Sequence, residues 1–431
     1  MHFHTLEEWL RWQETLHPRT IDLGLERVRQ VAQALGLAPF ACPVITVGGT
    51  NGKGSCVALL EAMLGAAGYR VGAFTSPHLV RYNERIRVGG RLATDEELMD
   101  AFARIERVRG ERSLTFFEFN TLAALLLFQG SSPDAVLLEV GLGGRLDAVN
   151  IVDADVALLT SVSLDHCDWL GNTVEDIGRE KAGIFRGDRP AVLGSADMPQ
   201  SVFAAAHALG TSLRIPGIDF SFRTHASSWD WASRDTRFRD LPLPALAGRR
   251  QPGNAAAAIA VLQELRSRLP IDQAALARGL RDVRLRGRFE LVRTDPVWIL
   301  DVAHNAEAAG ALSENLQALP ASGRTIAIVG VLKDKDAPAL IAPLLPLVTR
   351  WIAATTTGPR GQSAAELRAR CAPLLDRHCE EAASIEEACE LARREARSAD
   401  RVVVYGSFQT IGPALQWLER SVGSSAILAR H

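Results

Sequence analysis

The feature that most constrains the fold of this chain is an alternation of short apolar runs with longer amphipathic segments. Residues 44–47, 70–74, 135–140, 156–160 and 191–193 are rich in β-branched and other apolar side chains and have the length of strands. Several runs are apolar at consecutive positions, which is typical of parallel strands covered by helices on both faces. The pattern predicts a doubly wound, mostly parallel sheet, in which ligands bind at the carboxyl ends of the strands.

The alternation continues into a second expected unit. Its expected strands are residues 297–300, 325–329, 351–354 and 402–405. Helical spacing separates the strands in both halves, at 55–67 and 96–108 and again at 306–319 and 384–397. Because 431 residues are many for one core, we expect a P-loop-type α/β domain over residues 1–289 and a smaller, Rossmann-like α/β domain over 290–431. The segment 199–253 is rich in aromatic residues, Pro and Arg, and its pattern predicts short strands and turns.

Composition and charge exclude several classes of partner. The formal net charge of −2 gives no bulk attraction to nucleic acid or to an anionic membrane. The N-terminus lacks the pattern of a secretion signal, and Thr5 with Glu8 predicts a helix capping box instead. The longest apolar run, residues 122–128, is shorter than the roughly 20 residues of a membrane span. Six scattered Cys without a C-x-x-C pair favour reduced thiols, so we expect a cytoplasmic protein. A monomer is the default expectation.

A glycine-rich loop, Gly48-Gly-Thr-Asn-Gly-Lys-Gly-Ser55, follows the first expected strand and precedes a helix. The backbone N–H groups of such a loop, the positive end of the helix and the ammonium of Lys53 all attract phosphate. The loop departs from the usual P-loop, since Val47 stands where the first Gly is expected and Gly54 separates Lys53 from Ser55. Strand, loop, lysine and helix together still predict phosphate binding.

Charged and polar side chains stand at the ends of two further expected strands. Glu139 closes a buried apolar strand, where a charge requires a metal or a basic partner. One alternative is an ion pair with Arg145. Asp165 and His166 follow another strand that should end at the same edge of the sheet. A single His in that position is often structural, but Glu139 on the same edge favours a metal site.

The segment Gly49-Thr-Asn-Gly-Lys-Gly-Ser55 resembles the nucleotide loop of the folylpolyglutamate synthase/dihydrofolate synthase family, a branch of the Mur-type amide ligases. Six more motifs match that family in the same order: Ser76-Pro-His-Leu79, residues 139–147, Leu164-Asp-His166, residues 178–184, Gly287-Arg-Phe289 and Asp301-Val-Ala-His-Asn305. Residues 199–248 and the last dozen residues fall outside the informative stretches.

The resemblance implies ATP as co-substrate and a set of residues that contact it. These are Thr50, Asn51, Gly52, Lys53, Gly54, Ser55, Asn254, Arg288 and Asp301. The planar guanidinium of Arg288 suits a phosphoryl group, and His304 is expected near the transferred phosphoryl group or the incoming glutamate. Residues 249–254 do not align cleanly with the family, which weakens the assignment of Asn254. Asp301 also fits the N-cap of the helix that follows it.

The resemblance further implies two magnesium ions. Ser76, Glu139 and His166 are expected to hold one of them, and manganese can substitute because imidazole is an unusual magnesium ligand. The matching family lysine, here Lys181, is carbamylated by carbon dioxide, and the anionic carbamate would hold the second ion. The alternative is a surface lysine paired with Glu180 or Asp176. Lys53, Lys181, Arg288 and His304 form the expected catalytic group.

The pterin contacts rest on the same resemblance. They are Asp22, Leu23, Gly24, Thr115, Phe116, Phe117, Glu118, Leu146, Asp147 and Ala148. A phenylalanine there can stack on a flat bicyclic ring, and the carboxylates can accept hydrogen bonds from its N–H groups. Alternatively, residues 115–120 are simply the start of a core helix.

The resemblance therefore implies an ATP-dependent ligase that joins L-glutamate to dihydropteroate and to reduced folates through an acyl phosphate. Another Mur-type ligase is the nearest alternative, although a UDP-sugar substrate normally brings an additional N-terminal domain and only about 43 residues precede the first expected strand. A P-loop kinase, a motor ATPase and a scaffold without turnover are alternatives from other classes. A serine hydrolase at Ser76 lacks the G-x-S-x-G turn.

Overall fold

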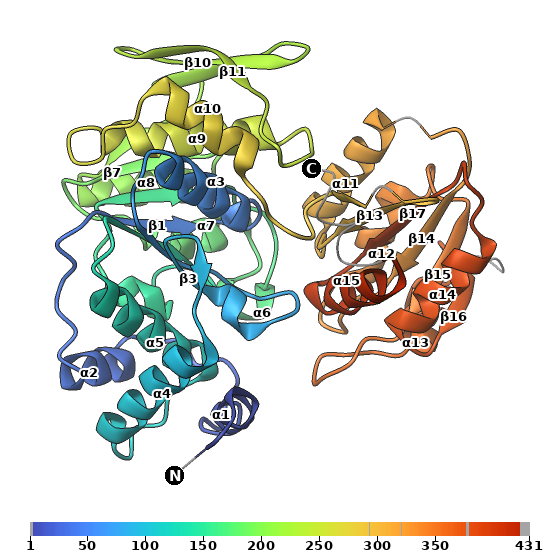
Figure 1. Ribbon diagram of the computed structural model, residues 1–431, viewed down its shortest axis with the longest axis horizontal. Helices are drawn as coiled ribbons and strands as arrows, with labels where there is room; N and C mark the ends of the chain where they lie inside the picture. The colour runs from blue at the N-terminus through green and yellow to red at the C-terminus, as the bar shows by residue number, and fades with distance from the viewer. Residues whose placement is uncertain (1–2, 293, 320, 376–378, 423–431) are drawn as a thin grey trace. The chain divides into compact units, whose positions relative to one another are not determined.

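The computed structural model describes residues 3–292, 294–319, 321–375 and 379–422, which form two compact units. Unit 1 contains the chain up to His78, Asn83–Pro244 and Pro252–Val283. Unit 2 contains Leu79–Tyr82, Ala245–Gln251 and the described residues from Arg284 onward. In Figure 1 most of unit 1 runs from blue to yellow and most of unit 2 from orange to red. The chain enters unit 2 for the last time at Arg284, whereas the sequence predicts a change of domain at residue 290.

An eight-stranded sheet of order β4-β3-β2-β5-β1-β6-β7-β8 forms the centre of unit 1. Its strands are β1 (Val44–Gly48), β2 (Val71–Phe74), β3 (Ile86–Val88), β4 (Arg91–Leu92), β5 (Ala135–Glu139), β6 (Val156–Leu159), β7 (Pro190–Leu193) and β8 (Ser212–Arg214). The strands from β2 to β8 in this order are parallel, and β3 runs antiparallel to both of its neighbours, β2 and β4. The predicted doubly wound, mostly parallel sheet is confirmed. Each of the five expected strands agrees to within one residue at either end.

Helices surround this sheet. They are α1 (Leu6–Gln13), α2 (Glu26–Ala34), α3 (Lys53–Ala66), α4 (Asp95–Arg109), α5 (Phe116–Ser131), α6 (Cys167–Leu170), α7 (Val174–Ala182), α8 (Gln200–Leu209), α9 (Gln251–Glu264) and α10 (Gln273–Asp282), with single 3₁₀ turns at Tyr82–Arg85 and Ala148–Ile151. Thr5 and Glu8 form the predicted capping box of α1. None of the helices in the described part of the chain has the length and apolar character that a membrane crossing requires.

Residues 199–253 contain more regular structure than the sequence predicts. Strands β9 (Phe220–Thr224), β10 (Ser228–Ser233) and β11 (Arg237–Pro242) form a separate antiparallel sheet. The expected short strands are present, and α8 is a helix that the sequence did not predict here. The sequence of this helix, QSVFAAAHAL, is apolar on most sides, so it shows no clear helical period. Its Ala and Leu residues favour a helix through their intrinsic propensity.

Unit 2 has a six-stranded sheet of order β12-β13-β17-β14-β15-β16. Its strands are β12 (Glu290–Val292), β13 (Val297–Asp301), β14 (Thr325–Val329), β15 (Arg350–Ala354), β16 (Cys379–Ala382) and β17 (Arg401–Tyr405), and its helices are α11 (Ala306–Ala318), α12 (Ala337–Ile341), α13 (Ala364–Arg370), α14 (Ile385–Glu395) and α15 (Phe408–Val422), with a 3₁₀ turn at Ala342–Leu344. Only β12 runs antiparallel to its neighbour. Successive residues alternate between two apolar clusters: Ile299 and Val403 belong to one, Leu300 and Val404 to the other. Two covered faces explain why these strands are apolar throughout.

The packing of α10 on α3 predicts stability changes of opposite sign for two glycine-to-alanine substitutions. A Cβ at Gly279 would lie 2.5 Å from the Cα of Met63, whereas one at Gly65 in α3 would meet nothing within 4 Å. Gly279→Ala should therefore lower the free energy of unfolding by about 1–3 kcal/mol. Gly65→Ala should raise it by about 0.5–1 kcal/mol, because alanine has the higher helix propensity. Urea denaturation measures both, and a shift of the same sign in the two variants would contradict this packing.

Candidate active site

The polar groups that the sequence predicts in unit 1 follow four adjacent strands, β2, β5, β1 and β6. The glycine-rich loop follows β1, Ser76 follows β2, and Glu139 is the last residue of β5. Asp165 and His166 lie a few residues beyond the end of β6. Since these strands are parallel, all four sets of groups lie at one edge of the sheet, where doubly wound proteins bind their ligands.

The glycine-rich loop is fixed by the segment that follows β6. A Cβ at Gly49, which has φ +139°, would lie 1.9 Å from the Thr160 hydroxyl oxygen. That hydroxyl donates to the carbonyl oxygen of Asn51 over 2.7 Å. The Thr50 N–H donates to the Ser161 carbonyl over 2.8 Å, and the Asn51 N–H donates to the Ser161 hydroxyl over 3.0 Å. Sequence reasoning missed Thr160 and Ser161, although a polar run directly after an apolar strand was a usable signal.

Two lysine side chains meet at one carbonyl oxygen of the loop. The Lys53 ammonium donates to the Gly49 carbonyl over 2.9 Å and to the Thr50 carbonyl over 3.0 Å. The Lys181 amine, from α7, donates to the same Gly49 oxygen over 3.0 Å. Lys181 is 5% exposed, so the structure brings it from the end of a helix to the phosphate loop.

The alternative of a surface Lys181 is therefore wrong. Its two suggested partners are engaged elsewhere: Glu180 accepts a hydrogen bond of 2.8 Å from Arg145, and Asp176 pairs with Arg179 at 3.2 Å. Sequence spacing on α7 suggested these partners, but the helix turns its Lys181 face toward the sheet. Arg145, which the sequence suggested as a partner of Glu139, pairs with Glu180.

Two buried groups beside this loop have pKa values close to neutrality. Burial lowers the pKa of Lys181 to about 7, and the positive charge of Lys53 acts in the same direction. Burial raises the pKa of Asp147 to about 7, while hydrogen bonds from three backbone N–H groups and the charge of Lys53 act against it. Buried groups that titrate near neutrality, next to a phosphate-binding loop, are typical of functional sites.

Glu139 and Ser76 lie together. The Glu139 carboxylate is 4% exposed and accepts a hydrogen bond of 3.1 Å from the Ser76 N–H. His166 occupies the N-cap of α6 in the left-handed region, with its Nε2 3.9 Å from the Asp165 carboxylate. A carboxylate and a hydroxyl at one corner fit a hard divalent cation. Within the described ranges no three His, Cys, Asp or Glu side chains group around one point, so a cation here needs further oxygen donors such as Ser76.

Asn254, whose sequence alignment is poor, nevertheless lies at the loop. A Cβ at Gly52 would lie 3.1 Å from the Asn254 amide oxygen. The Cys56 thiol, one turn into α3, donates to the Asn254 carbonyl over 3.8 Å. The start of α9 therefore packs against the start of α3, and the Asn254 side chain covers Gly52.

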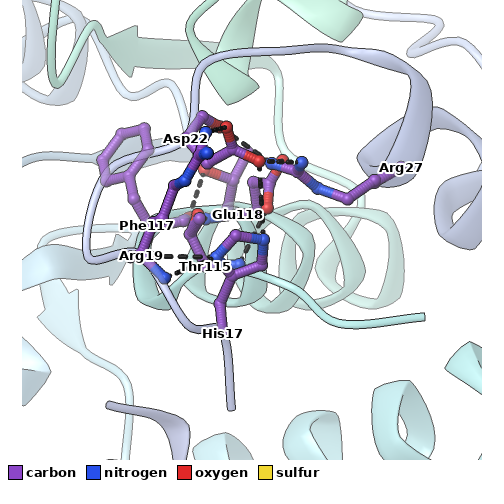
Figure 2. Close-up of polar contacts among 8 residues, drawn as sticks. His17, Arg19, Asp22, Arg27, Thr115, Phe117 and Glu118 are labelled. Carbon is purple, nitrogen blue, oxygen red and sulfur yellow. Dashed lines mark hydrogen bonds and ion pairs between the residues drawn. The ribbon is translucent and has the colours of Figure 1, made fainter. Parts of the chain in front are cut away.

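The expected pterin segments are joined by a residue that the sequence did not single out (Figure 2). Arg27, in the first turn of α2, forms an ion pair with the Asp22 carboxylate and donates to the Asp22 carbonyl over 2.8 Å. The same amino group that donates to the Asp22 carbonyl also donates to the Glu118 carboxylate over 3.0 Å. Glu118 in turn accepts the Thr115 N–H over 2.8 Å within the capping box of α5. Residues 115–120 are thus the start of a core helix, as the alternative had it, and Arg27 ties that helix to Asp22.

The remaining pterin candidates are held by local packing. The Phe117 ring lies 5.7 Å from that of Phe74 and would collide with a Cβ at Gly141, 2.7 Å away. The Arg85 guanidinium lies 5.5 Å from the centre of the Phe116 ring. Asp147 uses both carboxylate oxygens to accept the backbone N–H groups of Gly141, Leu142 and Val149. The carboxylate therefore fixes the backbone conformation of residues 141–149.

In unit 2 the Asp301 carboxylate closes β13. It accepts the Phe289 N–H over 2.9 Å and the Ala303 N–H over 2.7 Å. Burial raises the pKa of Asp301, whereas the positive charge of Arg288 acts against it. The N-cap alternative for Asp301 is wrong, because Asn305 caps α11 by accepting the Ala308 N–H over 2.9 Å.

An aromatic ring brings Arg288 and His304 together. The Arg288 guanidinium lies 5.0 Å from the centre of the Phe408 ring, and the His304 ring lies 6.3 Å from the same ring. Phe408 begins α15, directly after Ser407, whose hydroxyl accepts the Thr410 N–H. Sequence reasoning missed Phe408, because nothing in its spacing separates it from an ordinary core residue.

Comparison with known proteins agrees with this architecture. Residues 47–262 match the Mur ligase middle domain, and residues 287–408 match the glutamate ligase domain of Mur ligases. A dihydrofolate synthase/folylpolyglutamate synthase of Escherichia coli K12 is 44% identical over 414 residues, which cover 96% of each chain. The chain belongs to the dihydrofolate synthase/folylpolyglutamate synthase family of Mur-type ligases.

Solved structures of the family have the same fold. Escherichia coli FolC in complex with DHPP and ADP is 43% identical with a TM-score of 0.92, covering 97% of this chain and 98% of that one. A bifunctional folylpolyglutamate synthase/dihydrofolate synthase with Mn, AMPPNP and L-glutamate bound is 45% identical with a TM-score of 0.89, covering 96% and 98%. The predicted family, fold and enzyme class, an ATP-dependent acid–amino-acid ligase, are confirmed. The kinase, motor, hydrolase and scaffold alternatives are set aside.

The Arg27 network leads to a prediction about ligand binding. Arg27→Ala should weaken dihydropteroate binding on the order of tenfold, because the loop at Asp22 and the start of α5 lose charged hydrogen bonds that join them. Arg19→Ala is the matched control, since Arg19 is 74% exposed and only approaches Asp22 at 3.6 Å. Calorimetric titration with dihydropteroate measures both variants. Equal affinities in the two variants would show that the Arg27 network does not shape a pterin site.

Proposed function

We propose that this chain adds L-glutamate to dihydropteroate and then to reduced folates, in ATP-dependent reactions that form an amide bond. The observation that carries the proposal is the 44% identity to the Escherichia coli enzyme along 96% of both chains. Relatives of similar identity hold DHPP with ADP, or Mn, AMPPNP and L-glutamate. These ligands correspond to the acid, the nucleotide, the cation and the amine that the proposed reaction requires.

The proposed chemistry runs through an acyl phosphate. One carboxylate oxygen of the acid attacks the γ-phosphorus of ATP, and the bond to ADP breaks. The glutamate nitrogen then attacks the carbonyl carbon to give a tetrahedral intermediate, which expels phosphate while the nitrogen loses its proton to solvent. The reaction needs no protein nucleophile, so the side chains contribute position and charge.

We assign the nucleotide phosphates to the loop from Thr50 to Ser55, with Lys53 as its cation. The Lys53 ammonium already lies on the loop, bonded to the Gly49 and Thr50 carbonyls, so little side-chain freedom remains to be lost when phosphate binds. Asn254, whose side chain covers Gly52, is assigned as a further nucleotide contact in unit 1. Arg288 and Asp301 are the assigned ATP contacts of unit 2, and His304, beside the same Phe408 ring as Arg288, is assigned to the amine step.

Ser76, Glu139 and His166 are the residues that would hold a magnesium or manganese ion. The buried Glu139 carboxylate and the adjacent Ser76 supply the hard oxygen donors, and His166 supplies a nitrogen. A cation bound there would neutralise charge on the transferring phosphoryl group. The pterin ring is assigned to the segments around Asp22, Phe117 and Asp147.

We further propose a monomer that acts in the cytoplasm. All six Cys are free thiols, as expected where the surroundings are reducing. The net charge of −2 gives no general reason to expect a nucleic acid partner.

The proposed reaction has a direct test. Phosphate release should require ATP, a divalent cation, L-glutamate and dihydropteroate together, and a second activity should appear when tetrahydrofolate replaces dihydropteroate. Omission of each component in turn provides the controls. Equal release without any pteroate or folate would overturn the ligase proposal, and activity on tetrahydrofolate alone would remove the first of the two activities.

Substitution of two charged groups tests the assigned phosphoryl site. Lys53→Ala and Glu139→Gln should each reduce turnover on the order of 10²- to 10³-fold, because each removes one preorganised charge contact from the transferring group. Arg145→Ala is a control, since its guanidinium bonds Glu180 at the surface. Circular dichroism checks the fold. Near-normal turnover in either test variant, with an unchanged spectrum, removes that residue from the site.

Lys181 is proposed to carry a carbamate that holds the second magnesium ion. The neutral amine attacks carbon dioxide, a nitrogen–carbon bond forms, one electron pair moves onto oxygen, and the amine proton is released. The side chain is buried at the phosphate loop, 3.0 Å from the Gly49 carbonyl and close to Lys53. A second positive charge there would repel a cation, whereas a carbamate supplies two oxygen donors.

The carbamate should depend on pH in a defined direction. With the pKa of Lys181 lowered to about 7, the amine is charged below that pH and neutral above it, so the carbamate fraction should rise as pH increases through neutrality. Carbon-13 bicarbonate NMR measures this fraction. Lys181→Ala should lose both the NMR signal and the activity, and a small added carboxylate should partly restore turnover. An unmodified amine at neutral pH together with a fully active Lys181→Ala would refute the carbamate.

A further inference from the structure

The antiparallel sheet β9–β11 contributes no group to the chemistry described so far, yet it lies on the helices behind the phosphate loop. In Figure 1 strands β10 and β11 run beside α9 and α10, and β11 contacts α10 directly. One face of the sheet is aromatic and buried: its members are Phe220, Trp229, Trp231 and Phe238. The Trp231 ring packs between those of Phe220 and Phe238, with centroids 6.2 and 5.8 Å away.

Trp231 makes a polar contact from this sheet to α9. Its indole N–H donates to the Ala256 carbonyl over 3.0 Å, and both residues are fully buried. A carbonyl inside a helix already accepts the N–H of the fourth residue onward, so the indole supplies an additional bond from outside the helix. Phe222 flanks the same helix start, where a Cβ at Gly253 would meet its ring at 3.6 Å.

The opposite side of this helix start faces the phosphate loop. The Asn254 amide oxygen covers Gly52 at 3.1 Å from the Cβ position, and the Cys56 thiol donates to the Asn254 carbonyl. The first turns of α9 are therefore held between the aromatic sheet and α3. A shift of α9 along this direction would change the separation of Asn254 from Gly52 directly.

We propose that Trp231 is a positioning residue for nucleotide binding, which acts by fixing the start of α9 and thereby the Asn254 side chain over the loop. The inference rests on the proposed role of this loop in ATP binding. A phenylalanine would fill most of the same space, so the specific contribution of tryptophan is its N–H. On this basis the sheet β9–β11 supports the back of the nucleotide site.

The same strand contains a matched control. Trp229, two residues earlier, is as deeply buried as Trp231 and donates its indole N–H to the Pro242 carbonyl over 2.9 Å. That acceptor belongs to β11, inside the sheet, and not to α9. Trp229→Phe and Trp231→Phe therefore remove the same group from the same strand, but only the second removes a contact to the helix that carries Asn254.

The test measures the affinity for ADP with magnesium by calorimetry, together with the KM for ATP and for dihydropteroate. Loss of one buried neutral hydrogen bond predicts about a fivefold weaker ADP affinity and a similar rise in the KM for ATP in Trp231→Phe. The KM for dihydropteroate should stay unchanged. Trp229→Phe should lower the melting temperature as much as Trp231→Phe does, while leaving the ADP affinity unchanged. If Trp231→Phe does not fold, Trp231→Met, which is also apolar and lacks a donor, takes its place with the same expectation.

A double substitution separates positioning from general loosening. In an Asn254→Ala background, Trp231→Phe should cause no further loss of ADP affinity, because its effect passes through Asn254. Additive losses, or equal losses in Trp229→Phe and Trp231→Phe, would overturn the proposal. If the wild-type protein binds ADP but has no glutamate ligase activity, the proposed function is refuted. The ADP affinities of the variants would still test the role of Trp231.

Discussion

The Gly49 carbonyl, which accepts hydrogen bonds from two lysines, is the interaction on which the rest of the site depends. It requires a glycine backbone, because Thr160 occupies the space of any Cβ. Thr160 in turn lies at the end of β6, which pairs with β1. The loop conformation therefore depends on the register of two parallel strands, and α7 brings the buried Lys181 to the same carbonyl.

Much of this arrangement could be predicted from the sequence, because its main determinants are local. Five apolar runs gave the parallel strands, and parallel strands place their carboxyl ends together. Glu139 and His166 could thus be assigned to one edge from their positions after strands, whereas Ser76 was assigned through the family resemblance. The capping box of Thr5 and Glu8 was also readable, since it depends on residues three apart.

The parts that could not be predicted depend on contacts between distant segments. Arg27 and Glu118 are separated by 91 positions, and no local pattern in α2 points to α5. The Phe408 ring and Arg288 meet only because β17 lies beside β13. In α7 the sequence pattern suggested an exposed Lys181 beside acidic neighbours, but the tertiary fold buried it. Propensity and spacing describe one element at a time, whereas these contacts depend on how distant elements pack together.

The route of the chain has a consequence for modularity. Leu79–Tyr82 and Ala245–Gln251 belong to unit 2, although the residues on either side of each belong to unit 1. Leu79 and Val80 pack against the apolar cluster that contains Leu300 and Val404. A fragment cut at Arg284 would lose these side chains and expose the surface that they cover. Exchange of catalytic modules between relatives by a single crossover at Arg284 would therefore combine parts of the C-terminal core from two different parents, and a graft of the whole of unit 2 needs five junctions.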